Sequence, residues 1–277
     1  MTWQKVRTNS NFAYVIWFLF YFLLFWLILG ASLTSFLIVA GIYLVSIAIA
    51  FSPLAEALWR NMCGVRPLRI RSEKIRLLPL FKEVYQGAVK VNPDLSGGIK
   101  LYIQEDMDIN AFAFGTTTLV ITRGSIELLS DECLKGLLAH ELGHFSNYDT
   151  VAVLLSSIGN FLMSFPLKIL SNIKRRLDAE TTGILASIIL IPVYLLYIVF
   201  KAIDSIGNLI LLHINRQNEY RADAFAMQSG FCSEITNALI ELYQMAIHKP
   251  KSIKEQLKST HPHITLRIER LEKVLYQ

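Results

Sequence analysis

Long runs without a charged residue organise the sequence. The first, Phe12–Ala55, is interrupted only by small and hydroxyl residues at Gly30–Ser32 and Thr34–Ser35. About 20 residues make a helix long enough to cross a bilayer, so this run predicts two membrane helices joined in a tight hairpin. Two later runs, Thr150–Leu167 and Thr181–Phe200, are each just long enough for a further crossing.

The segments around these runs have soluble character. Ile99–Gln104 and Ala111–Thr122 are rich in β-branched and aromatic residues, with Gly115 as a turn between strands, and predict a small antiparallel sheet. Ser130 is a candidate N-cap for a helix that continues to about Phe145. Residues 233–247 and 264–275 have the apolar spacing of amphipathic helices.

The pattern as a whole predicts a mostly α integral membrane protein with a small antiparallel β-sheet and two apolar helical pairs. We expect four parts. They are an N-terminal transmembrane hairpin at 1–55, the first part of a soluble domain at 56–149, a second apolar helical pair at 150–212, and the second part of the soluble domain at 213–277.

Composition supports a membrane protein. The chain is 53% hydrophobic and 18% charged, whereas soluble domains have about 45–50% apolar and about 25% charged residues. The net charge of +5 fits basic residues at the ends of membrane helices better than a nucleic-acid partner, so none is expected. Three cysteines without a CxxC motif favour a reducing compartment over a disulfide framework.

Basic residues flank the first hairpin on both sides. Lys5 and Arg7 precede it, and several arginines from Arg60 to Arg76 follow it. Cytoplasmic loops carry an excess of Lys and Arg, so both ends of the hairpin and residues 72–149 are expected in the cytoplasm. A crossing by Thr150–Leu167 would then carry the basic segment 168–176 outside. Either the charge rule is overridden here, or the second pair is shallow or packed against the first.

The most specific motif is His140-Glu141-Leu142-Gly143-His144. Two histidines four residues apart lie on one face of a helix, and this spacing lets both imidazoles reach one Zn²⁺. Glu141 is then placed to take a proton from the water that attacks the substrate. Gly143 leaves space beside the metal. The alternative is a pair of ordinary helix histidines.

A catalytic zinc site uses three protein ligands and one open position. The other histidines are candidates for the third ligand: His213, His248, His261 and His263. Glu219 is a better candidate, because it lies on a polar stretch compatible with a helix. Asp223, four residues on, would share its face and accept a hydrogen bond from a ligand histidine. The alternative for this pair is a solvated helix face with Arg216 and Arg221.

These motifs resemble those of the membrane zinc metallopeptidases that include the heat-shock protease HtpX and the CAAX prenyl proteases. The matching elements, in the family's order, are Asn110–Gly115, His140–His144 with Asn147 and Asp149, Asn218–Asp223, and Ser259–Pro262 with Arg267 and Leu271. The resemblance covers about residues 70–275 and implies a gluzincin-type zinc protease domain. The chain departs from the family at Phe114, where a small or hydroxyl residue is more common.

The resemblance implies a role for each matching position. It implies one Zn²⁺ per chain held by His140, His144 and Glu219, with Glu141 as the base. His261, in a turn restricted by Pro262, resembles the family histidine that stabilises negative charge on the substrate carbonyl oxygen.

The resemblance also bears on substrate binding. Residues 110–114 would form an edge strand beside the active-site helix, which an extended substrate could join at Asn110, Ala111, Phe112 and Ala113. An ordinary core strand is the alternative. Arg267 is expected to pair with an acid near the site and to contact the substrate. The alternative is a surface helix residue.

The predicted function is a membrane-bound zinc endopeptidase with its active site facing the cytoplasm, in the inner or plasma membrane if the source is bacterial. The family implies a role in membrane protein quality control, with misfolded membrane proteins as substrates and the bilayer as a further partner. Processing of prenylated peptides is an alternative. A membrane signal transducer with a protease domain is another, and it would need an attached sensor domain.

Overall fold

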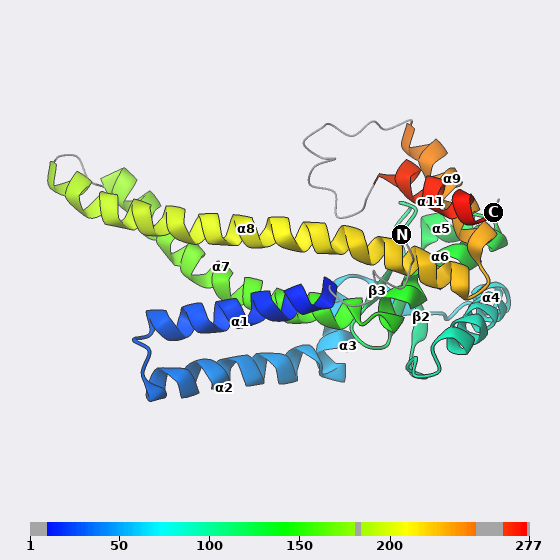
Figure 1. Ribbon diagram of the computed structural model, residues 1–277, viewed down its shortest axis with the longest axis horizontal. Coiled ribbons are helices and arrows are strands. Elements are labelled where there is room, and N and C mark those ends of the chain that lie inside the picture. Colours follow the sequence, from blue (N-terminus) through cyan, green and yellow to red (C-terminus); the bar gives the residue numbers. More distant parts are fainter. Residues whose placement is uncertain (1–9, 181–183, 248–262, 276–277) are drawn as a thin grey trace.

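The computed structural model describes residues 10–180, 184–247 and 263–275 (Figure 1). The first two helices are α1 (Ser10–Ile28) and α2 (Leu33–Ala50), which lie side by side as the predicted hairpin. Gly30 takes a positive φ of 94° in the turn, and Ser32 caps α2 by accepting a hydrogen bond from the backbone of Ser35.

A second hairpin consists of α7 (Asp149–Glu180) and α8 (Ile184–Gln228) and extends past the turn of the first (Figure 1). α8 is continuous through residues 212 and 213, the expected boundary between two parts of the chain. Its polar end, which carries Asn218–Asp223, therefore belongs to the same helix as its apolar run.

Within the described residues, three helices are long and apolar enough to cross a membrane. They are α2 and the stretches Asp149–Ile173 and Ile191–Gln228, while the apolar stretch of α1, Tyr14–Ile28, is shorter. α1 packs on α7 and α8 through a core cluster that includes Tyr14, Trp17, Met163 and Phe200. The second pair is thus packed against the first.

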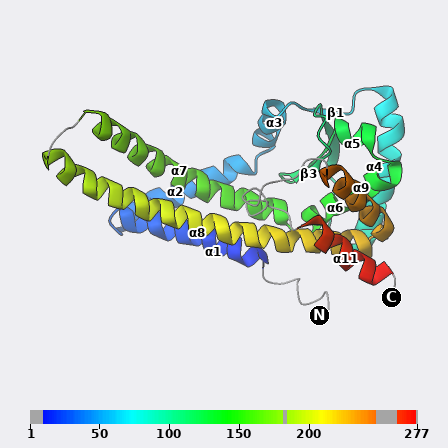
Figure 2. The same cartoon turned by 90° about the horizontal axis from the view of Figure 1, so that it is seen from above.

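The remaining described residues form a small sheet with helices around it, at one end of the hairpins (Figure 2). The strands are β1 (Val65–Pro67), β2 (Lys100–Gln104), β3 (Ala111–Phe114) and β4 (Thr118–Thr122), in the order β1-β2-β4-β3. The helices are α3 (Pro53–Met62), α4 (Arg71–Val91), α5 (Arg123–Leu128), α6 (Asp131–Ser146), α9 (Cys232–Ile247) and α11 (Ile264–Leu275).

The expectation of a purely antiparallel sheet is wrong. β2 and β4 pair in parallel, whereas β1–β2 and β3–β4 are antiparallel. The segment between β2 and β3 passes over the end of β4, so β4 lies beside β2 and β3 is left at the edge. Two backbone hydrogen bonds hold this crossing, from Thr122 N–H to Asn110 C=O (3.0 Å) and from Gly124 N–H to Asp106 C=O (2.8 Å).

One apolar core joins the sheet to the helix that carries the histidine motif. Leu134, Leu138 and Leu142 of α6 are fully buried against residues of the sheet, α4 and α9. Ser130 caps α6 as predicted, because its hydroxyl accepts a hydrogen bond from Cys133 N–H at 3.2 Å. The core therefore fixes the position of α6 in the domain.

Candidate metal centre

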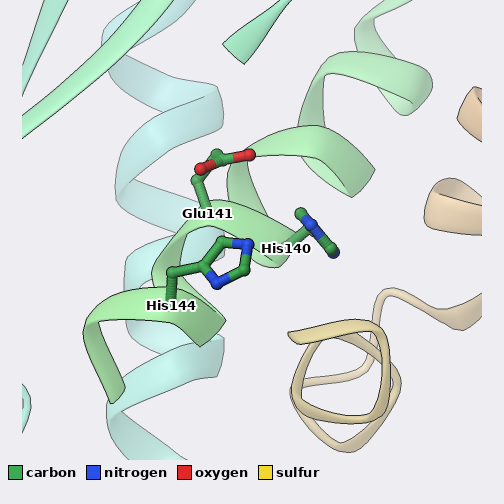
Figure 3. A group of neighbouring side chains, drawn as sticks. All are labelled: His140, Glu141 and His144. Atoms are coloured by element: carbon green, nitrogen blue, oxygen red, sulfur yellow. The ribbon is translucent and has the colours of Figure 1, made fainter. Parts of the chain in front are cut away.

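The histidine motif lies in the buried last two turns of α6 (Figure 3). His140 and Glu141 are 4% and 7% exposed. Ligand atoms of His140, Glu141 and His144 all lie within 4.8 Å of one another, and these residues could hold a metal ion. The helix thus presents two imidazoles and a carboxylate to one point.

Glu219 of α8 faces both imidazoles. Its Oε2 lies 3.4 Å from His140 Nε2, and its Oε1 lies 3.6 Å from His144 Nε2. The side chain is buried. α8 therefore adds a carboxylate to the two histidines, in the position predicted for a third ligand.

Each histidine has a second carboxylate on its other ring nitrogen. His140 Nδ1 lies 2.9 Å from Asp223 Oδ1, as predicted, and His144 Nδ1 lies 2.9 Å from Asp149 Oδ2. A carboxylate accepts hydrogen bonds, so it favours the tautomer with the proton on Nδ1. In that tautomer both Nε2 atoms carry a lone pair on the Glu219 side, and Arg267 Nη2 also lies 3.5 Å from His140 Nε2.

Arg267 of α11 closes the site from a third element. Its Nε donates to Asp223 Oδ2 at 2.8 Å and its Nη2 to Asp223 Oδ1 at 2.6 Å, and its Nη1 lies 2.9 Å from Glu219 Oε2. The side chain is buried. Arg267 thus pairs with acids of the site and is not a surface helix residue.

A second arginine, Arg221, has an equivalent place on the His144 side. Its Nη2 donates to Asp149 Oδ1 at 2.6 Å and to Asn218 Oδ1 at 2.7 Å. Asn218 in turn donates to the hydroxyl of Tyr14 in α1, at 3.5 Å. These contacts connect the first apolar helix to the residues around His144.

The sequence did not indicate this group of contacts. Asp149 entered only as part of a family match, and Arg221 as a residue of a solvated face. Arg221 lies two positions from Glu219 and so points to a different side of α8, where α7 begins. The available signal was the acidic residue Asp149 directly before the uncharged run Thr150–Leu167.

The acids of the site raise the affinity of its histidines for protons. Burial and the Arg267 charge lower the pKa of His140, but hydrogen bonds to Asp223 and Glu219 outweigh them and hold it above its usual value. Burial also lowers the pKa of His144, and the hydrogen bond to Asp149 leads the effects that raise it. An environment that stabilises an imidazolium also attracts a metal cation.

The predicted substrate strand lies at the edge of the sheet. In the described part of the chain, β3 pairs with β4 on one side and has no strand on the other. Its four residues are half-buried, so it is not an ordinary core strand. The backbone N–H of Asn110, just before β3, points into the domain. It donates to the hydroxyls of Thr122 (2.9 Å) and Ser125 (2.8 Å).

Two of the remaining histidines, His248 and His261, lie outside the described residues. His263 is exposed at the start of α11, and its Nδ1 lies 2.8 Å from the hydroxyl of Thr265. It therefore does not join the imidazoles of α6.

Comparison with known proteins agrees with this architecture. The model of "Peptidase family M48" matches residues 90–275. The chain therefore belongs to peptidase family M48, a family of metalloproteases, and it carries helices of membrane-spanning character. The predicted relationship to the HtpX and CAAX prenyl proteases is confirmed.

The chain is similar to several proteins named "Protease HtpX homolog". It is 26% identical to that of Dictyoglomus turgidum over 299 residues, covering 97% of this chain and 93% of the relative. It is 31% identical to that of Streptococcus mutans over 208 residues, covering 63% of this chain and 67% of the relative.

A solved structure shares the fold. The crystal structure of S. mikatae Ste24p matches with a TM-score of 0.52 at 19% identity, over 92% of this chain and 61% of Ste24p. The chain thus spans less than two thirds of that protein.

Proposed function

We propose that this chain is a membrane-bound zinc endopeptidase whose ligands are His140, His144 and Glu219. The main support is the pair of distances from the Glu219 carboxylate oxygens to the two histidine Nε2 atoms, 3.4 and 3.6 Å. Two donor atoms that each lie about 2.0–2.1 Å from a tetrahedral ion are about 3.4 Å apart. The donor set of two imidazoles and a carboxylate is also typical of catalytic zinc.

The charge of the site supports a bound cation. Four carboxylates, Glu141, Glu219, Asp149 and Asp223, face two guanidinium groups, Arg221 and Arg267. With neutral histidines, four negative and two positive charges leave a net charge of −2. Buried charge is costly unless it is compensated, and one divalent cation compensates it.

A bound Zn²⁺ would supply Lewis-acid polarisation of a peptide carbonyl and lower the pKa of a water molecule. Glu141 is the proposed base. It directly follows His140 in the helix, and its carboxylate lies in the same site as both imidazoles. It would take the proton of the attacking water and deliver it to the leaving amine. His261 is proposed to donate a hydrogen bond to the carbonyl oxygen as negative charge develops there.

Asp223, Asp149 and Arg267 are proposed to position the ligands. The two aspartates hold the imidazoles through Nδ1, and Arg267 binds both Asp223 and Glu219. Since the guanidinium of Arg267 is committed to these acids, a positioning role fits it better than the predicted contact with substrate.

The substrate is proposed to be an extended segment of a protein or peptide that adds to the edge strand β3 at Ala111, Phe112 and Ala113. Main-chain hydrogen bonds of this kind bind a substrate largely independently of its side chains. Such binding suits proteolysis of misfolded membrane proteins in quality control. The basic flanks of the first hairpin support an active site on the cytoplasmic side.

The function is tested with the full chain purified in detergent and an unstructured model protein as substrate. We expect cleavage, its loss after treatment with a chelator, and its return with added Zn²⁺. Glu141→Gln controls for a contaminating protease. Cleavage by this variant at the parental rate, or cleavage that resists the chelator, would contradict the proposal.

A further inference from the structure

The helix α3 is amphipathic, but its apolar side faces outward and its charged side faces the protein. Three apolar side chains one turn apart point outward, with Leu54, Leu58 and Met62 being 69%, 55% and 86% exposed. The charged residues of the helix point into the protein, since Glu56 is 7% exposed and Arg60 is half-buried. Such a stripe is unfavourable in water, so the outer face of α3 has the character of a surface that meets an apolar phase.

The inward face is tied to the β3–β4 turn by specific contacts. Glu56 Oε1 accepts hydrogen bonds from the N–H (3.1 Å) and the hydroxyl (3.0 Å) of Thr117. Arg60 Nη1 donates to the hydroxyl of Thr118 at 2.7 Å. Gly115 leaves room for this carboxylate, because a Cβ there would lie 2.7 Å from Glu56 Cδ. α3 is therefore held in one rotation about its axis.

α3 is also held at the end of a membrane helix. Two residues separate it from α2, and the hydroxyl of Ser52 connects the two helices by donating to Ile49 C=O (2.7 Å) and accepting from Ala55 N–H (3.0 Å). Figure 1 shows α3 where the hairpin meets the sheet. Because α2 is apolar enough to cross a bilayer, the end of α2 and the outer face of α3 would lie at the same depth, at the surface of the bilayer.

We propose that the outer face of α3 lies in the membrane surface, with Leu54, Leu58 and Met62 among the lipid chains near the headgroups. Helices that lie in the membrane surface have one apolar face and one polar face, and the polar face of α3 carries Glu56 and Arg60.

The lipid contact has a consequence for the edge strand. The ring of Trp59 stacks on Phe114 of β3 with a centroid distance of 3.8 Å, and it meets Phe112 edge-on at 5.8 Å. Phe114 is the position at which the chain departs from the resembling family. The stack places β3 beside the membrane surface, so the substrates are segments that emerge from the bilayer. This consequence rests on the proposed function, whereas the lipid contact does not.

The consequence is tested with Phe114→Ser, which removes the stack. We expect the KM for an extended peptide to rise several-fold at unchanged kcat and zinc content. Phe161→Ser is the control, because it removes an exposed phenylalanine of α7. An unchanged KM for Phe114→Ser would overturn the coupling of α3 to the strand. Absence of cleavage by the parent chain would instead contradict the proposed function.

The lipid contact is tested without any turnover. Nitroxide labels are placed on single cysteines at 54, 58 and 62 of the full chain, with Cys63, Cys133 and Cys232 replaced, in nanodiscs of phosphatidylcholine and phosphatidylglycerol. Met107→Cys is the control, because Met107 is 63% exposed in a loop of the sheet. We expect collisions with oxygen to exceed those with a nickel chelate at the three α3 positions, and the reverse at 107.

Two results would overturn the lipid contact. One is an accessibility to the nickel chelate at 54, 58 and 62 equal to that at 107. The other is protection at α3 with spin–spin broadening between labels, since this would show a second copy of the chain on the apolar stripe.

Discussion

Gly143 of α6 lies against Ala222 of α8 with backbone in contact with backbone. A Cβ at Gly143 would be 2.9 Å from Ala222 Cα and 3.0 Å from Ala222 C=O oxygen. Each of these two residues adjoins a residue of the metal centre, His144 and Asp223. The space expected beside the metal is thus taken by α8, and this close approach sets the distance between the histidines and Glu219.

Gly143→Ala is expected to weaken zinc binding, because the added methyl group forces the two helices apart. Inserting a methyl group into a tightly packed contact costs about 1–3 kcal/mol, which corresponds to a rise of about 5- to 150-fold in the dissociation constant for zinc. Competition with a chromogenic chelator measures this constant. Gly97→Ala is the control, since its nearest contact would be at 3.9 Å. Equal zinc affinity in both variants would contradict the role of the contact.

Asp149→Asn is expected to lower zinc affinity about 10- to 100-fold, the usual cost of losing a carboxylate that orients a metal-binding histidine. The amide cannot accept from both His144 and Arg221 as the carboxylate does. Asp131→Asn serves as the control, since it removes a half-exposed carboxylate, paired with Arg76, at the start of α6, the helix that carries His144. The same chelator competition applies, and an affinity equal to that of the control would show that Asp149 does not orient His144.

The acid sensitivity of the fold is expected to depend on Glu73. Hydrogen bonds from Arg66 and Arg123 lower the pKa of Glu73 from 4.5 to about 2. The unfolded chain therefore binds a proton at higher pH than the folded chain does. The stabilisation is complete above pH 4.5 and is lost as the pH falls towards 2.

Glu73→Gln removes this dependence. We expect its thermal midpoint to lie about 5 °C below that of the parent at pH 7, for a loss of roughly 1.5–3 kcal/mol, and the difference between the two midpoints to shrink as the pH is lowered to 3. Circular dichroism melting in detergent gives both curves. Glu127→Gln is the control, because its carboxylate is exposed and 3.6 Å from Arg123. A constant difference between parent and Glu73→Gln from pH 7 to 3 would argue against the ion-pair network.

His261→Ala is expected to lower turnover about 100-fold with zinc retained, as for the loss of a donor to a developing oxyanion. His263→Ala should change turnover little, because His263 is exposed and contacts Thr265. Turnover and zinc content are measured on the same preparations. Zinc loss in His261→Ala would make His261 a ligand, and near-normal turnover would remove it from the mechanism.

The local features of the site could be predicted from sequence, because each is encoded within one helix. The spacing of His140 and His144 predicts a shared face, Ser130 predicts the start of α6, and the polar stretch around Glu219 is compatible with a helix. Glu219 and Asp223 share a face for the same reason. All of these expectations agree with the structure.

The features that depend on the meeting of distant segments could not be predicted. The parallel pairing of β2 with β4 follows from a crossing that local patterns do not record. Arg221 and Asp149 are 72 positions apart, and only the packing of α7 on α8 brings them together. The inward face of α3 was unexpected too, since its charges are paired with a turn that lies some 60 residues later.

The central claim is that Glu219 binds the metal whereas Glu141 acts on the water. The direct measurement is the zinc content per chain of Glu219→Ala and Glu141→Gln, with turnover measured in parallel. We predict that Glu219→Ala loses zinc and activity together, and that Glu141→Gln keeps one zinc per chain while turnover falls at least about 100-fold. Full zinc occupancy in Glu219→Ala, or loss of zinc from Glu141→Gln, would contradict the account.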